Sequence, residues 1–73
     1  MENYEVYYNS IKEGSKTMKC FDNYEEAERY YKHLKGTVKL TEGENFGIDC
    51  FDEGGNYIDD CTPSEREVYY NEQ

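Results

Sequence analysis

The chain has no long apolar segment, and no stretch approaches the ~18 consecutive apolar residues of a membrane-spanning helix. Its first residues, MENYEVYYNS, lack the basic and apolar regions of a signal peptide, so we expect a cytoplasmic protein that does not bind membranes. Neither GxGxxG nor GxxxxGK occurs, so the usual phosphate-binding loops are missing. These absences argue against membrane, secreted and nucleotide-binding proteins.

Cysteine is scarce and its spacing carries no motif. Cys20, Cys50 and Cys61 are odd in number and form no CxxC pair, which argues against a secreted disulfide framework and against a zinc ribbon. We therefore expect free thiols and no cofactor. Cys50 and Cys61 could face each other across a hairpin, where a disulfide is the rarer alternative in a cytosolic protein.

Aliphatic residues are also few, since Val, Ile, Leu and Phe together number 11 of 73 residues. With a net charge of −9, such a content is typical of disordered chains. Nine tyrosines favour a folded chain instead, because each ring can bury an apolar face while its hydroxyl finds a polar partner. A chain of this length buries only roughly 60% of its unfolded surface. We expect one small acidic domain over residues 1–73.

Basic residues almost vanish after Lys39. The chain has 7 acids and 7 bases up to that residue, and 10 acids and 1 base after it. Because 7 − 7 = 0 and 1 − 10 = −9, the last 34 residues carry the whole net charge. Clustered negative charge repels other acidic surfaces and steers a protein toward basic ones. The charge pattern therefore points to a basic partner.

The first half of the chain predicts a hairpin followed by a helix. Residues 4–11 and 16–21 are rich in strand-forming types and flank a glycine turn. Asp22 and Asn23 are both suitable caps for a helix over about 23–35, and Gly36 can end it. Its apolar stripe at helical spacing comprises Tyr24, Ala27, Tyr31 and Leu34.

The second half predicts three strands, at 37–41, 46–51 and 56–61, the last two forming a hairpin around an Asp-Glu-Gly-Gly turn. Phe46, Ile48 and Cys50 alternate and mark the core face. The sequence thus predicts an α+β fold of order β-β-α-β-β-β, with a small antiparallel sheet built from two hairpins packed on one amphipathic helix. Residues 62–73 fit either a short helix or a strand.

Catalytic signals are weak. The single histidine, His33, falls near the end of the predicted helix among lysines, and no local signature pairs it with a cysteine such as Cys20. Asp59 and Asp60 are adjacent on a strand and should point to opposite faces. A domain of this size has little room for a substrate cleft, so we expect no enzyme.

Residues 49–60, DCFDEGGNYIDD, concentrate five carboxylates and an asparagine, and calcium takes six to eight oxygen ligands. The EF-hand register fails, because it places Phe51 or Gly54 at a ligand position. An irregular cation site in a calcium-responsive domain stays as the second alternative function.

The acidic stretch itself is the best candidate for a functional site. Direct nucleic-acid binding is disfavoured because phosphate contacts require clustered Lys and Arg. A rigid body bearing carboxylates can instead occupy the basic channel of a nucleic-acid-binding protein. Tyr57 can serve as the aromatic anchor of such an interface. The candidate partner-binding residues are Glu42, Glu44, Asp49, Asp52, Glu53, Tyr57, Asp59 and Asp60.

In size, acidity and α+β pattern the chain resembles the small acidic inhibitors that phages and mobile elements use against host nucleic-acid enzymes. These include anti-CRISPR, anti-restriction and DNA-mimic proteins. No motif carries the resemblance, so no residue roles are transferred. The resemblance implies a non-enzymatic inhibitor that blocks a basic surface. The first alternative is a structural or adaptor domain whose acidity serves solubility.

Overall fold

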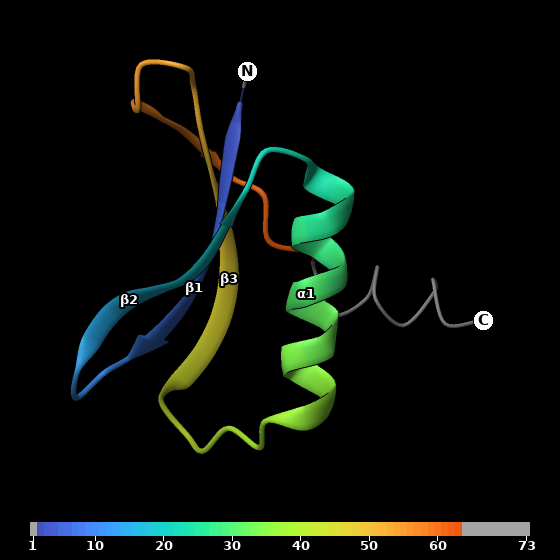
Figure 1. Ribbon diagram of the computed structural model, residues 1–73. Helices are drawn as coiled ribbons and strands as arrows, with labels where there is room; N and C mark the ends of the chain where they lie inside the picture. Colours follow the sequence, from blue (N-terminus) through green and yellow to red (C-terminus); the bar gives the residue numbers. More distant parts are fainter. Residues whose placement is uncertain (1, 64–73) are drawn as a thin grey trace.

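A four-stranded antiparallel sheet carries one helix on one of its faces (Figure 1). The computed structural model describes residues 2–63, so most of the tail at 62–73 lies outside the described part. The strands lie in the order β2-β1-β3-β4, with β1 and β3 in the centre. The α+β class and the two hairpins are confirmed. The elements are β1 (Asn3–Ser10), β2 (Gly14–Phe21), α1 (Tyr24–Thr37), β3 (Glu44–Phe51) and β4 (Tyr57–Asp60).

The two central strands supply the core side of the sheet. Val6 on β1 is the cross-strand partner of Ile48 on β3, and both side chains are fully buried. Phe46 and Cys50, two residues to either side of Ile48, are buried as well. The predicted core face of this strand is therefore confirmed, and a strand's period of two puts the residues in between on the other face.

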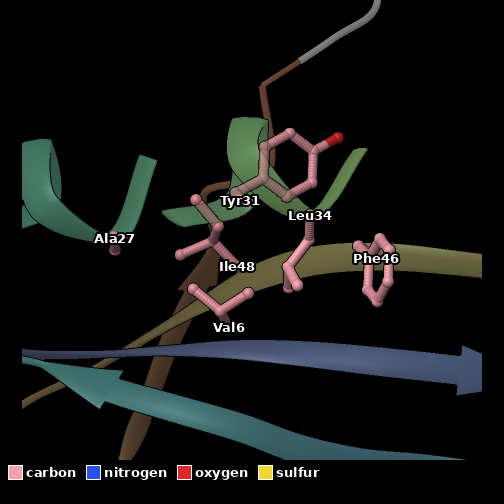
Figure 2. Packing of buried hydrophobic residues seen from close by; sticks show 6 residues of the cluster. All are labelled: Val6, Ala27, Tyr31, Leu34, Phe46 and Ile48. Carbon is pink, nitrogen blue, oxygen red and sulfur yellow. The ribbon is translucent and has the colours of Figure 1, made fainter. Parts of the chain in front are cut away.

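The helix begins where a capping residue was predicted. The Asn23 side chain accepts a hydrogen bond of 3.2 Å from the backbone N–H of Glu26, which satisfies one of the unpaired donors of the first turn. The stripe of Ala27, Tyr31 and Leu34 is buried against the sheet (Figure 2). Within residues 2–63, no helix is long and apolar enough to cross a membrane.

The strand predicted at 37–41 is wrong. The helix continues through Gly36 to Thr37, whose hydroxyl donates to the His33 carbonyl, and the Val38 N–H donates to the Leu34 carbonyl. The following residues, 38–41, form no regular element. Gly36 lies within α1, and its φ is not in the positive range that usually ends a helix at glycine. The sheet consequently has one strand fewer than predicted, and the order is β-β-α-β-β.

The helix covers one face of the sheet, and no second layer covers the opposite face in the described part of the chain (Figure 1). We call this uncovered surface the open face. Strand alternation places Glu5 and Tyr7 of β1, and Asp49 of β3, on the open face. The side chains on this face need no apolar partner, so polar and charged residues are tolerated there.

Candidate partner-binding site

Three carboxylates stand side by side across the open face. Glu5 on β1 is the cross-strand partner of Asp49 on β3, and Asp49 is the partner of Asp60 on β4. Directly opposed residues on a sheet have Cβ atoms about 4.5–5.5 Å apart. We call these three residues the acidic row. It brings together two of the predicted site residues and adds Glu5.

The folded state disfavours the negative charge of Asp49, the central carboxylate of the row. Burial, and then the charges of Asp60 and Glu5, raise the pKa of Asp49 above its ordinary value. The outer two carboxylates each accept a hydroxyl: Thr17 donates to Glu5 at 2.8 Å and Tyr7 to Asp60 at 3.2 Å. Burial tends to raise the pKa of Asp60 too, but hydrogen bonds from Thr62 and Tyr7 outweigh it and lower that pKa.

A glycine makes room for one of these hydroxyl contacts. Tyr7 is the cross-strand partner of Gly47, and a Cβ added at Gly47 would overlap the end of the Tyr7 ring. The missing side chain lets the ring lie across β3 and reach Asp60 on the next strand. Gly47 therefore positions Tyr7 along the acidic row.

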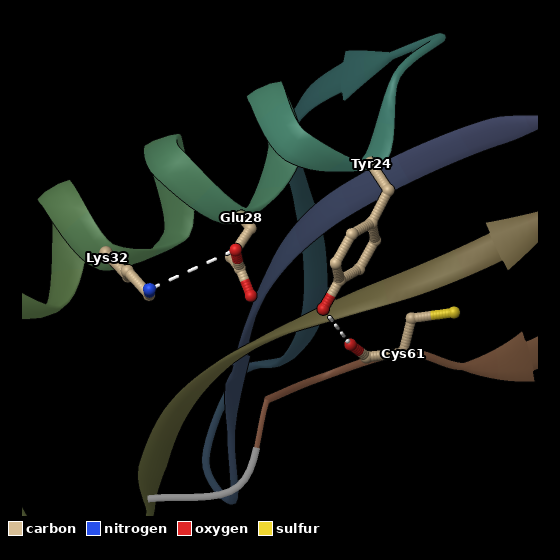
Figure 3. Close-up of polar contacts among 4 residues, drawn as sticks. All are labelled: Tyr24, Glu28, Lys32 and Cys61. Carbon is tan, nitrogen blue, oxygen red and sulfur yellow. Dashed lines mark hydrogen bonds and ion pairs between the residues drawn. The ribbon is translucent and has the colours of Figure 1, made fainter. Parts of the chain in front are cut away.

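The segment after β4 fixes Asp60 in place. Ile48 of β3 makes two hydrogen bonds of 2.8 Å to this segment. The Ile48 carbonyl accepts from the Cys61 N–H, and the Ile48 N–H donates to the Thr62 hydroxyl. The Tyr24 hydroxyl of α1 donates to the Cys61 carbonyl at 3.1 Å (Figure 3). Contacts from β3 and from the first turn of the helix therefore hold the segment that follows Asp60.

Aromatic side chains border the acidic row at the β3–β4 hairpin. The rings of Tyr57 and Phe51 meet edge to face with centroids 5.9 Å apart. Tyr57 is 58% exposed, so a large part of its ring can contact a partner. Burial and the charges of Asp49 and Asp60 raise the pKa of Tyr57, which keeps its hydroxyl protonated. This is the amphipathic anchor that interfaces favour.

The described basic side chains lie mainly on the helix side of the molecule. The Lys19 ammonium lies 5.3 Å from the Phe21 ring centroid, and Lys35 lies 5.6 Å from the Tyr31 ring centroid. Lys32 forms an ion pair of 3.9 Å with Glu28 on the side of α1 that also carries Tyr24 (Figure 3). None of these three contacts involves a carboxylate of the acidic row.

Two predicted site residues lie at the far end of β3 instead. Glu44 accepts hydrogen bonds from the backbone and hydroxyl of Thr41 and from the Tyr8 hydroxyl. The bonds from Thr41 and Tyr8 lower the pKa of Glu44 to about 2. Glu42 sits in the adjacent turn and lines the same hollow as Glu44. Here Glu44 fastens the loop to β1, a structural task that the sequence did not reveal.

The remaining predicted acids surround the second hairpin. Asp52 accepts hydrogen bonds from the backbone N–H groups of Gly54 and Asn56, which build the turn and lower its pKa. Glu53 is exposed in that turn. Asp59 is the partner of buried Cys50, so it takes the face toward α1, opposite to Asp60 as predicted for adjacent strand residues. The eight candidates therefore do not share one surface.

Two residues of the open face were missing from the sequence-based set, Glu5 and Tyr7. Both alternate with the buried Val6, and this local signal is visible in the sequence. The sequence does not show which strand they pair with, because the β1–β3 contact joins segments far apart in the chain. Glu5 was therefore counted with the first half of the chain, whose net charge is zero, and not with the acidic stretch.

The described thiols and the histidine lie apart. Cys20 is the cross-strand partner of Glu5 on the open face, whereas His33 lies on the helix, so the two do not pair. All three cysteines are free. Burial raises the pKa of each thiol, that of Cys61 to about 11, so the reactive thiolate is disfavoured. Within residues 2–63, no three His, Cys, Asp or Glu side chains are placed to hold a metal ion.

Comparison of the chain with protein-family models, curated proteins and solved structures finds no match in any of the three. The geometry described above therefore carries the functional argument by itself.

Replacing Gly47 by alanine is expected to lower the free energy of unfolding by about 1–3 kcal/mol. The new Cβ displaces the Tyr7 ring and crowds the Thr62 hydroxyl, which holds the backbone of β3. Urea unfolding measures the change. Gly36→Ala is the matched control, because an added Cβ there meets no atom within 4 Å; in a helix it should be neutral or stabilising. Equal midpoints for Gly47→Ala and the native chain would contradict the close contact.

Neutralising the centre of the acidic row is expected to stabilise the fold at pH 7. The raised pKa of Asp49 means that the folded state opposes its charge, so this penalty acts at neutral pH and disappears as the pH falls through that pKa. Asp49→Asn should therefore add about 0.2–1 kcal/mol at pH 7 and nothing at pH 2.

Asp60→Asn provides the control of opposite sign. The lowered pKa of Asp60 means that its charge supports folding above the ordinary pKa, and this support is lost as the pH falls through the folded value. The variant should be destabilised at pH 7. Urea midpoints at several pH values test both, and two variants that change stability in the same direction would refute the electrostatic assignment.

Proposed function

We propose that the protein is a non-enzymatic acidic module that binds a basic surface of a partner through the open face of its sheet. One observation carries the proposal: Glu5, Asp49 and Asp60 are direct neighbours across three strands, and none of the lysines placed above faces them. Tyr57 and Phe51 add apolar contact area beside these charges. A row of charge with an aromatic border fits a basic surface that has exposed apolar patches.

The row is poorly explained by solubility alone. Like charges directly opposite one another destabilise a sheet, and scattered charge would keep a small domain soluble with less repulsion. Burial, and then the charges of Asp60 and Glu5, raise the pKa of Asp49, so repulsion within the row is one part of this shift. A basic partner would relieve it, so binding gains from a feature that costs the free protein stability.

Nucleic-acid-binding proteins are the partner class that this face suits best. They present basic channels that hold the phosphate backbone, and a rigid anionic surface can take its place. The strands that carry the acidic row are paired with one another, and hydroxyl groups of Thr17 and Tyr7 hold the carboxylates of Glu5 and Asp60 before binding. A preorganised surface loses less entropy on association. The protein would then act as an inhibitor of its partner.

The thiol chemistry supports a role without catalysis. Nucleophilic catalysis by cysteine needs an activated thiolate beside a base, and the pKa shifts of Cys20, Cys50 and Cys61 oppose thiolate formation. The carboxylates of the acidic row lie on an uncovered sheet surface and not in a cleft that could exclude water. Binding is the activity that such a surface can perform.

The proposal predicts that the triple variant Glu5→Gln, Asp49→Asn and Asp60→Asn loses its partner. The measurement is capture by the immobilised protein from a heparin-binding fraction of cell lysate, eluted along a salt gradient. Removing three charges from the interface should reduce capture at low salt by at least about tenfold. It should also flatten the salt dependence that the native protein shows.

A second triple variant, Glu13→Gln, Asp22→Asn and Glu25→Gln, changes the net charge equally at exposed positions in the β1–β2 turn and around the start of α1. It should retain the captured partner. Duplex DNA added to the complex should displace the protein, because both are proposed to occupy one basic surface. Equal losses in the two triple variants would point to general acidity, and a partner that binds DNA and this protein together would refute the inhibitor model.

A further inference from the structure

The helix side of β2 carries charge opposite in sign to that of the protein as a whole. The helix packs mainly over β1 and β3, so two hollows open along β2, of about 570 and 240 Å³. We call them together the β2 groove. The first is lined by residues that include Lys19, Phe21, Arg29 and Tyr30, and the second by residues that include Lys16, Met18, Val38 and Lys39.

Charge in the β2 groove favours an acidic occupant. Its basic residues are Lys16, Lys19, Arg29 and Lys39, and its acids are Glu26 and Glu44, which gives 4 − 2 = +2 with His33 neutral. The Glu44 carboxylate is already held by Thr41 and Tyr8. The groove is thus positive although the chain has a net charge of −9. It favours negatively charged partners, whereas the open face favours positively charged ones.

The floor of the groove is aromatic. The rings of Phe21 and Tyr30 lie 5.5 Å apart, and the Lys19 ammonium stands 5.3 and 5.6 Å from their centroids. A cation held over rings can bind a carboxylate while the rings contact the aliphatic part of the same side chain. Glutamate has both parts, which makes it a fitting residue for this floor.

The backbone of β2 is the third component of the groove. In the described part of the chain β2 lies at the edge of the sheet and pairs with β1 alone, and seven of its eight residues are exposed. Edge strands present unpaired N–H and C=O groups to which an extended peptide can add as a new strand. Specificity then comes from every second side chain of the added strand.

We propose that the β2 groove binds an extended acidic segment of a protein, which pairs with β2 as a fifth strand and directs its carboxylates toward Lys16 and Lys19. These lysines share one face of the sheet, because their cross-strand partners Tyr8 and Val6 both pack toward α1. The groove differs in position and in charge from the open face. The inference is therefore independent of the function proposed above.

A second copy of this chain fits the edge less well. Pairing of β2 with another β2 would set the lysines of the two copies close together, between two chains of net charge −9 each. Lysines on edge strands are a means by which natural sheets avoid self-association. An acidic strand would instead be attracted to the same lysines.

The test is an NMR titration of the full chain with an acetylated eight-residue peptide of alternating threonine and glutamate. Saturable shifts concentrated in the amides of β2 are expected, together with slower hydrogen exchange there. A peptide with lysine in place of glutamate should not bind. Versions N-methylated at alternate residues, in both registers, distinguish strand pairing from charge attraction, and one register should abolish binding.

Lys19→Glu should weaken the glutamate peptide by at least about tenfold. Lys32→Glu, with the same change of charge at a residue of α1 that does not line the β2 groove, should change affinity less than about twofold. The open-face triple variant should still bind the peptide. The inference is overturned by shifts spread over the whole surface, by equal binding of both N-methylated peptides, or by a concentration-dependent dimer that already protects β2 without peptide.

Discussion

The contact between Val6 and Ile48 beneath the helix is the one on which the rest of the structure depends. These two side chains are fully buried at the centre of the sheet, and Ala27, Tyr31 and Leu34 close over them. A chain with so few aliphatic residues has enough apolar surface for one such layer. One helix therefore covers one face, and the other face is left to polar side chains. The surface chemistry of the protein follows from this single-sided core.

Single-sided packing also sorts the charge. Strand alternation sends each residue either toward α1 or toward the open face, so neighbours in sequence become parts of different surfaces. Lys16 and Lys19 go to the helix side, where Lys16 lines a hollow and the Lys19 ammonium lies over the Phe21 ring. Glu5, Asp49 and Asp60 go to the open face. The protein thereby presents an anionic sheet surface and a cationic groove on one small body.

Local patterns in the sequence predicted the elements of the fold well. The alternation of Phe46, Ile48 and Cys50, and the helical stripe from Tyr24 to Leu34, described the two sides of the core correctly. The strand expected at 37–41 failed because hydrogen bonds to His33 and Leu34 extend the helix past Gly36, which overrides the strand preference of these residues.

The candidate site was harder to predict than the fold, because it is made by pairing between distant segments. Composition pointed to Asp49, Tyr57 and Asp60, whose role in binding stays a prediction. It could not show that Glu5 joins them, because β1 meets β3 only in the folded sheet. Nor could it show that Asp52 and Glu44 hold turns together, since such hydrogen bonds depend on backbone geometry. The acidic sequence therefore predicted that the surface is anionic, but not which residues form it.

The most direct test of the central claim, that the open face is anionic and the β2 groove cationic, is paramagnetic relaxation of side-chain protons by small soluble nitroxides. A cationic nitroxide gathers near negative potential and an anionic one near positive potential. At low salt, the cationic form should relax the protons of Asp49 and Tyr57 more strongly, and the anionic form those of Phe21 and Tyr30. Equal relaxation of both groups by the two nitroxides, or the reverse order, would contradict the account.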